Sequence, residues 1–141
     1  MNVGESLSVN LANDVPSSNT TLISAGLPFP VGAGESYHFI YTLSCTATNL
    51  AGFDHKINAP NCNGDYINTS SSSASMGSGL AVNSRYGKVG TFQDTTSNTI
   101  SGDFVNTGGA TTCDLEIAQN TANGTPSKVK KGSSVLYTRT A

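Results

Sequence analysis

Tryptophan is absent from the 141 residues, and methionine and histidine occur only twice each. Charged residues make up 11% of the chain, less than half of their usual share in globular proteins. No lysine or arginine precedes Lys56, and the formal net charge is −2. Nucleic-acid-binding domains carry clustered positive charge, so this composition argues against a nucleic-acid partner.

Long apolar runs are also missing, and none of the apolar stretches could span a bilayer. Residues 1–5 lack the basic and apolar segments of a secretory signal. We therefore expect a protein made in a cytosol, with no membrane partner. Without a signal, the sequons at Asn19, Asn68 and Asn123 predict no glycosylation.

Three cysteines, Cys45, Cys62 and Cys113, are widely spaced and form no C-x-x-C pair. This pattern predicts reduced thiols and no zinc module. Cys113 lies in an alternating segment and is expected in the core, whereas Cys62 lies in a predicted turn over residues 61–64 and is expected to be exposed. His55, Cys62 and Cys45 could together form a metal site, but their spacing in the sequence matches no zinc module. We predict no cofactor and no metal.

Strand-like alternation replaces helical periodicity throughout the chain. The strongest case is residues 36–44, where Tyr37, Phe39, Tyr41 and Leu43 share one face. The predicted strands cover residues 7–11, 20–23, 36–44, 53–57, 66–67, 80–86, 89–93, 99–105, 112–118 and 134–140. Turn signals every 8–12 residues separate them, a rhythm typical of sandwiches and jelly rolls.

We therefore predict one all-β domain over residues 1–141, a jelly roll or β-sandwich of about eight to ten short antiparallel strands. Residues 13–19 are expected to form a turn or loop. The serine-rich residues 69–79 are expected to form a mobile surface loop. Extended segments are expected at both ends of the chain.

Catalytic chemistry is hard to build from these residues. The only histidines, His38 and His55, lie in predicted strands, and Gly77-Ser78-Gly79 lies in the predicted loop rather than in a nucleophile elbow. The glycines around Ala33 lack the lysine and helix of a phosphate loop. We predict that the protein is not an enzyme and has no small-molecule substrate, with a small carbohydrate-active enzyme as an alternative because nine carboxylates could supply a catalytic pair.

Three segments resemble small β-domains of tailed-phage virion proteins. They are the entry to the long strand (TTLI in residues 20–23 and GLPFPVGAGESYHF in residues 26–39), the internal ISGDF (residues 100–104) and the closing VKKGSSVLY (residues 129–137). Within that group, the chain resembles capsid decoration or cement proteins of the jelly-roll type. No catalytic residue is transferred, because the family pattern carries none.

The resemblance implies a virion protein on the outer capsid surface, made in the host bacterial cytoplasm. Its implied partners are the major capsid protein, whose neighbouring subunits it would clamp, and a second copy of itself in a homodimer. Edge strands and extended termini can add strands to a partner, which makes residues 2–10 and 128–139 candidates. The candidate partner-binding residues are Val3, Leu7, Lys128, Lys130, Lys131 and Arg139.

Two alternatives stay open. The lysines could be solvated charges that protect an edge strand against aggregation. The chain could also be a tail-fibre or receptor-binding module that recognises a host glycan or protein through residues 70–79 and nearby aromatic side chains.

Overall fold

The computed structural model describes residues 1–48, 50–70, 77–88 and 97–141. Within these ranges there is no helix, and every strand pairing is antiparallel. The strands are β1 (Ser6–Asn10), β2 (Val15–Ser17), β3 (Ile23–Ser24), β4 (Phe29–Val31), β5 (Ser36–Thr46), β6 (Phe53–Asn58), β7 (Cys62–Ser70), β8 (Gly77–Ala81), β9 (Arg85–Lys88), β10 (Ser97–Asn106), β11 (Thr111–Ala118), β12 (Ser127–Val129) and β13 (Ser134–Arg139). The prediction of an all-β sandwich or jelly roll is confirmed, with more strands than expected. β5, β7 and β10 are longer than the predicted segments, whereas β2, β3, β4 and β12 have only two or three residues.

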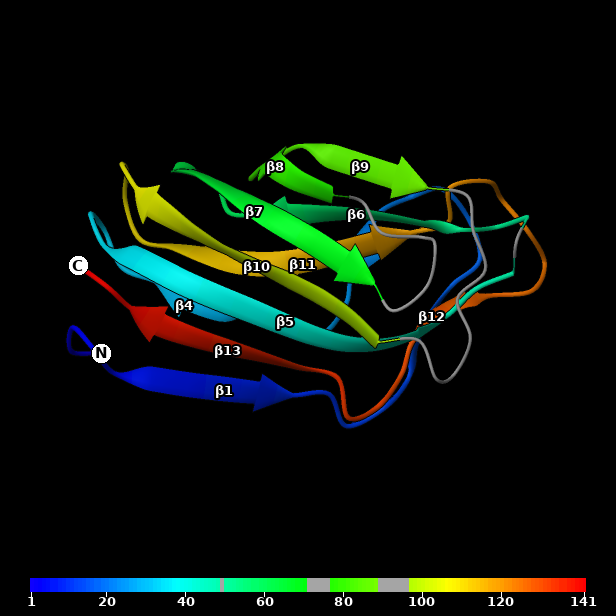
Figure 1. The fold of residues 1–141 in the computed structure, drawn as a ribbon, viewed down its shortest axis with the longest axis horizontal. Helices are drawn as coiled ribbons and strands as arrows, with labels where there is room; N and C mark the ends of the chain where they lie inside the picture. Colours follow the sequence, from blue (N-terminus) through cyan, green and yellow to red (C-terminus); the bar gives the residue numbers. More distant parts are fainter. Residues whose placement is uncertain (49, 71–76, 89–96) are drawn as a thin grey trace.

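Two sheets face each other. The larger has the order β1-β13-β5-β10-β7-β8, with β12 joining β5 to β2. The smaller has the order β3-β11-β6-β9, with β4 also paired to β11. Figure 1 shows the larger sheet in front of β11 and β6, with β1 along one edge and both chain ends on the same side. This arrangement leaves one face of the larger sheet turned away from the core.

Alternation along β5 creates the division between core and surface. Tyr37, Phe39, Tyr41 and Leu43 are at most 4% exposed, while the residues between them are half-buried or exposed. The same period continues in neighbouring strands, because Ile100 and Val135 lie opposite Tyr41 in the register and are buried too. A one-residue shift of any central strand would bring its apolar side chains to the outer face.

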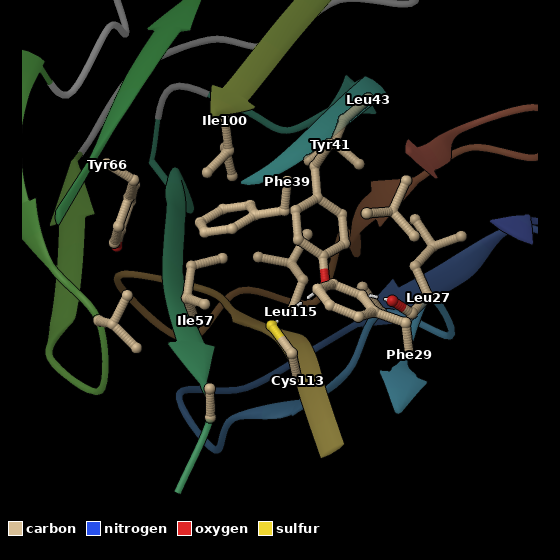
Figure 2. Close-up of a cluster of buried hydrophobic side chains, with 14 of the residues drawn as sticks. Leu27, Phe29, Phe39, Tyr41, Leu43, Ile57, Tyr66, Ile100, Cys113 and Leu115 are labelled. Carbon is tan, nitrogen blue, oxygen red and sulfur yellow. Dashed lines mark hydrogen bonds between the residues drawn. The ribbon is translucent and has the colours of Figure 1, made fainter. Parts of the chain in front are cut away.

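Aromatic side chains join the two sheets. The rings of Phe29 on β4 and Tyr137 on β13 stack with centroids 4.4 Å apart, and Phe29 also contacts Tyr37 and Phe104. Figure 2 shows this packing continuing through Phe39 and Tyr41 toward Leu115 and Cys113 of the smaller sheet. Each fully buried aromatic or aliphatic side chain contributes roughly 1.5–3 kcal/mol through apolar burial.

Two glycines let aromatic rings cover the middle of the larger sheet. Gly102 on β10 lies opposite Tyr66, and Gly64 on β7 lies opposite Phe104. A Cβ at Gly102 would overlap with the carbonyl oxygen of Asp65 and lie 2.5 Å from the Cβ of Tyr66. The close approach of β7 and β10 therefore requires glycine at this position.

Three short strands lie where we predicted loops or no strand. β2 occupies part of the predicted loop over residues 13–19, and β4 and β12 were not predicted at all. Pro16 and Pro30 interrupt the patterns of β2 and β4, and each of these strands pairs on one side only, where a missing N–H is tolerated. Three-residue strands are too short to show alternation.

The middle of the chain departs most from the prediction. β7 begins inside the predicted turn over residues 61–64, and both β7 and β8 extend into the predicted loop over residues 69–79. The predicted strand over residues 80–86 is divided between β8 and β9 by a turn at residues 82–83. Polar residues such as Asn63 and Asp65 point outward from β7, so the segment has few apolar residues although it pairs on both sides. The predicted strand over residues 89–93 and part of the predicted loop, residues 71–76, lie outside the described residues.

Candidate protein-binding surfaces

The six predicted partner-binding residues lie in two groups at opposite ends of β13. Val3 and Leu7 lie near Arg139, because β1 runs antiparallel to β13 and places Leu7 opposite Tyr137. Lys128 lies on β12, and Lys130 and Lys131 lie in the turn that precedes β13. The residues therefore do not form one continuous surface.

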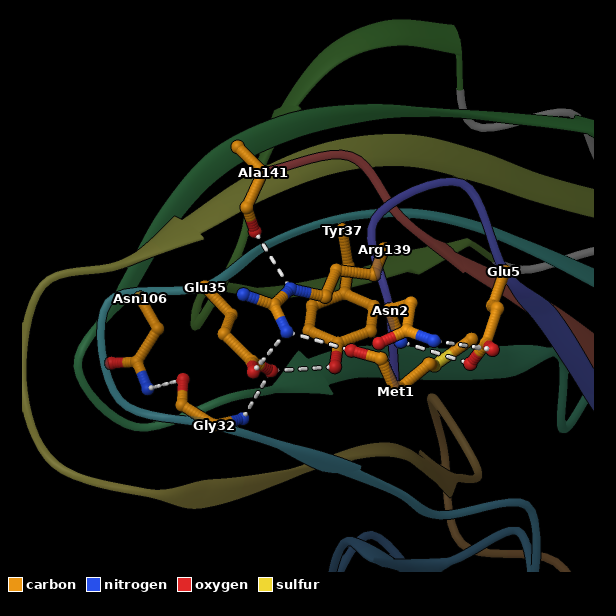
Figure 3. A network of polar contacts seen from close by, with 9 residues as sticks. All are labelled: Met1, Asn2, Glu5, Gly32, Glu35, Tyr37, Asn106, Arg139 and Ala141. Atoms are coloured by element: carbon orange, nitrogen blue, oxygen red, sulfur yellow. Dashed lines mark hydrogen bonds and ion pairs between the residues drawn. The ribbon is translucent and has the colours of Figure 1, made fainter.

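Arg139 is held by contacts within the chain (Figure 3). Its guanidinium lies 3.0 Å from Glu35 Oε1 and donates hydrogen bonds to the carbonyl oxygens of Met1 and Ala141. The hydroxyl of Tyr37 donates to Glu35 Oε2 at 2.7 Å, which lowers the pKa of Glu35; burial together with this carboxylate raises the pKa of Tyr37 to about 12. The network connects β13 to the N-terminal residues and to the turn before β5. The contacts of Arg139 thus stabilise this end of the fold. A docking role for Arg139 stays a prediction.

Of the three lysines Lys128, Lys130 and Lys131, only Lys130 forms a side-chain ion pair with Asp14. Lys130 Nζ lies 3.3 Å from Asp14 Oδ2, and the backbone N–H of Lys131 donates to Asp14 Oδ1 at 2.8 Å. That backbone hydrogen bond is the main reason why the pKa of Asp14 is lowered. Lys131 is exposed and Lys128 is half-buried at an outward position of β12. Lys128 and Lys131 are therefore the lysines of this group best placed to meet another molecule.

Apolar side chains are exposed where β1 forms the sheet edge. Val3 is 61% exposed and Leu7 is 53% exposed, although Leu7 lies on the same face of the sheet as the core residue Tyr137. A hollow of about 370 Å³ lies here, lined by Met1, Leu7, Pro30, Gly32, Glu35, Tyr37 and Tyr137.

A second surface was missed by our sequence reasoning. We call it the outer sheet face: the outward side chains of β13, β5, β10 and β7, centred on one row across the strands, namely Leu136, Ile40, Ser101 and Ile67. Leu136 is 44% exposed and Ile67 is 42% exposed. Thr42, Thr99 and Thr69 form the neighbouring row, and the outward positions of these four strands include no lysine or arginine. The alternation of Ile40 and Leu136 against the core residues was the signal that could have revealed this face.

A shallow hollow of about 290 Å³ lies on the outer sheet face. His38 Nδ1 and Asp103 Oδ1 are 2.9 Å apart at its rim, and Asp65 and Ser101 contribute further polar atoms. These groups can exchange hydrogen bonds with a ligand or a partner chain, because they are at least partly exposed.

The other histidine is buried and belongs to the core. His55 is 5% exposed, and its Nε2 lies 2.8 Å from the hydroxyl of Tyr66. Burial lowers the pKa of His55 to about 4, opposed in part by the neighbouring Asp54. The arrangement fixes a neutral ring between the sheets. In the described part of the chain, no three His, Cys, Asp or Glu side chains are gathered as a metal site would require.

All three cysteines are free and buried, which corrects the expectation for Cys62. Cys62 is 3% exposed because it begins β7 and packs into the hydrophobic core, whereas the asparagines on either side of it are exposed. Cys113 is in the core, as predicted. Burial raises the pKa of each thiol, that of Cys45 to about 12.

The described residues contain no helix that could cross a membrane. No protein-family model matches the chain, and no curated protein sequence is significantly similar to it.

Proposed function

We propose that this protein is a capsid decoration or cement protein that binds the outside of a viral shell and clamps neighbouring major capsid protein subunits. The observation that carries the proposal is the outer sheet face, with its exposed row through Leu136 and Ile67 and its lack of lysine and arginine. Exposed aliphatic side chains with few charges around them are characteristic of the centre of protein–protein interfaces. The charged side chains of the face, Asp65 and Asp103, lie beside the aliphatic row at the hollow.

The segments that carry the phage resemblance also support the proposal. Residues 26–39 form β4 and the start of β5, residues 100–104 lie in β10, and residues 129–137 include most of β13. Ile40 follows the first of these segments on β5, and Leu136 and Ser101 lie within the other two. The resemblance therefore falls on β5, β10 and β13, three of the four strands that build the outer sheet face, and not on β7, which carries Ile67.

The function requires binding and no catalysis. A protein that binds the assembled shell more tightly than free or unfolded subunits stabilises the shell by mass action. Contacts to two neighbouring subunits at once raise the effective affinity without any new chemistry. Weak contacts through the outer sheet face would thus add up over many equivalent positions.

The test is to strip the protein from particles, add it back and measure the heat and osmotic resistance of the shells. We expect added protein to restore resistance, and the Ile67→Asp variant to restore it only at a concentration at least tenfold higher, because a buried unpaired carboxylate is costly. Ile23→Asp is the matched control, since Ile23 is similarly exposed (37%) but lies on the smaller sheet. Shells that resist heat and osmotic shock equally with and without the protein would contradict the proposal.

A second candidate is a receptor-binding module of a phage tail. The hollow beside His38, Asp65 and Asp103 favours it, because carboxylates and imidazole recognise sugar hydroxyl groups. A glycan array separates the two candidates: a receptor-binding module should retain one class of glycan and lose it with Asp65→Ala, whereas a cement protein should retain none.

A further inference from the structure

β1 differs from the other sheet edges in the described part of the chain. β8, at the far edge of the larger sheet, has a register shift against β7 and two glycines with positive φ, Gly77 and Gly79. The remaining edges are short or carry proline or charge: β2 has Pro16, β3 has two residues, β4 has Pro30 and β9 begins with Arg85. Such features prevent edge-to-edge association.

β1 has none of these protective features. Its five residues pair with β13 in unbroken register, and they include no proline, glycine or charged side chain. An open, regular and uncharged edge presents a row of backbone groups to any further strand.

The hydrogen-bonding pattern shows which groups of β1 point away from the sheet. The N–H of Arg139 donates to the carbonyl oxygen of Glu5, and the N–H of Leu11 donates to that of Ser133. In an antiparallel ladder, alternate residues bond the same neighbour, so the odd-numbered residues of β1 direct their N–H and C=O groups toward β13. The N–H and C=O groups of Ser6, Ser8 and Asn10 therefore point away from the sheet. This set is symmetric about Ser8.

We propose that two copies of this chain associate through antiparallel pairing of β1 with β1, with a two-fold axis at Ser8. Ser8 then faces Ser8 of the second copy, and Ser6 faces its Asn10, so every outward N–H and C=O group of both strands is paired. A register shifted by two residues leaves some of these groups unpaired. Antiparallel pairing about a two-fold axis makes the interface isologous, with the same residues contributed by both copies.

The side chains of β1 also favour the register centred on Ser8. Leu7 faces Val9 of the second copy on the core side of the sheet, which covers the 53% of Leu7 that is exposed in one copy. Glu5 faces Leu11 of the second copy, whose carbonyl oxygen accepts a hydrogen bond from Gly132, next to the exposed Lys131. The proposed register therefore places Glu5 of one copy, whose carboxylate accepts hydrogen bonds from Asn2 of its own chain, and Lys131 of the other copy at the same end of the interface.

Cysteine cross-linking of the purified chain tests the register. The Cα atoms of the two Ser8 residues would be about 5.5 Å apart, within the range for a disulfide. Ser6→Cys is the matched control, because its two copies would be separated by roughly 13 Å along the strands. With diamide as oxidant, we expect Ser8→Cys to form covalent dimers at least tenfold faster than Ser6→Cys, and Ser6→Cys combined with Asn10→Cys to form them readily. Equal rates for Ser8→Cys and Ser6→Cys would overturn the proposal.

Analytical ultracentrifugation gives an independent test. The unmodified chain should sediment as a dimer, and Ser8→Pro should shift it to a monomer with an unchanged circular dichroism melt, because the N–H that proline removes points away from β13. Glu5→Lys should weaken the dimer, and adding Lys131→Glu should restore it. An unmodified chain that is monomeric up to millimolar concentration would overturn the proposal. These experiments use no shells, so their outcome is separate from that of the capsid role.

Discussion

His55 connects a single buried side chain to the stability of the protein. Its pKa, lowered to about 4 by burial, lies below the ordinary value of 6.5, so the folded state disfavours the protonated ring. The stabilising effect of the neutral ring is complete above pH 6.5 and is lost as the pH falls from 6.5 toward 4. From the size of the shift, the loss is on the order of 3 kcal/mol.

Urea unfolding at pH 7 and at pH 4.5 measures this loss. We expect the unfolding free energy of the unmodified chain to fall more between these pH values than that of His55→Gln, which has no titrating ring. The lowered pKa values of Asp14 and Glu35 add acid sensitivity at lower pH in both proteins alike. If the unfolding free energies of both proteins change equally between these pH values, the His55 ring binds a proton in the folded state as readily as in the unfolded state.

The three thiols give a second prediction at this scale. Because all of them are buried and burial raises each pKa, thiol reagents should react with the native protein only through local opening. We expect Cys62 to react faster than Cys113, because Cys62 begins its strand beside a turn, and both to react at once in 6 M urea. Labelling of native Cys62 as fast as in urea would contradict its placement in the core.

Among the elements, β5 could be predicted from sequence and β7 could not. β5 alternates buried apolar residues with outward residues that are polar except for Ile40, and the periodicity of two follows directly from its two differently solvated faces. β7 includes Asn63, Gly64 and Asp65, which favour turns locally. Pairing with β10 and β8 overrides that preference, and such long-range pairing leaves no periodic signal in the segment itself.

The candidate site shows the same limit. Val3 and Leu7 are candidates from sequence, because they are apolar residues that lie before the predicted loop over residues 13–19 and near the chain end. The row of Leu136, Ile40 and Ile67 comes from three strands that are far apart in the sequence, and only the register brings them together.

The pairing of β7 with β10 depends on the absence of a side chain at Gly102. We expect Gly102→Ala to lower the unfolding free energy by about 2–3 kcal/mol, because the added carbon would contact backbone atoms of β7 that cannot move independently. Gly109→Ala is the control, since nothing lies within 4 Å of a Cβ built there. Urea titration of both variants measures the difference; equal midpoints would mean that the sheet adjusts without cost.

At the scale of the whole molecule, association is expected to depend on surfaces with little charge. β1 and most of the outer sheet face supply apolar and hydroxyl groups, and the charges of that face are the carboxylates of Asp65 and Asp103. Lys128 and Lys131 lie at the far end of β13 from Val3 and Leu7. These lysines could still contribute a salt-sensitive share of shell binding.

Reversing both lysines tests that share. Lys128→Glu with Lys131→Glu should weaken shell binding at low salt and reduce its salt dependence, if the lysines meet acidic capsid surface. The pair of Lys130 with Asp14 is left intact, so folding should be unaffected. Binding to stripped shells by co-sedimentation at 50 and 300 mM salt is the measurement. Unchanged binding at both salt concentrations would mean that the lysines are solvated and take no part in docking.

The proposed capsid role is tested most directly by cryo-electron microscopy of particles that carry this protein. We expect density for the two-sheet domain on the outer shell, bridging neighbouring major capsid protein subunits, with the face that contains Ile67 against the shell. Density confined to the tail, or an outer shell surface without the domain, would contradict it.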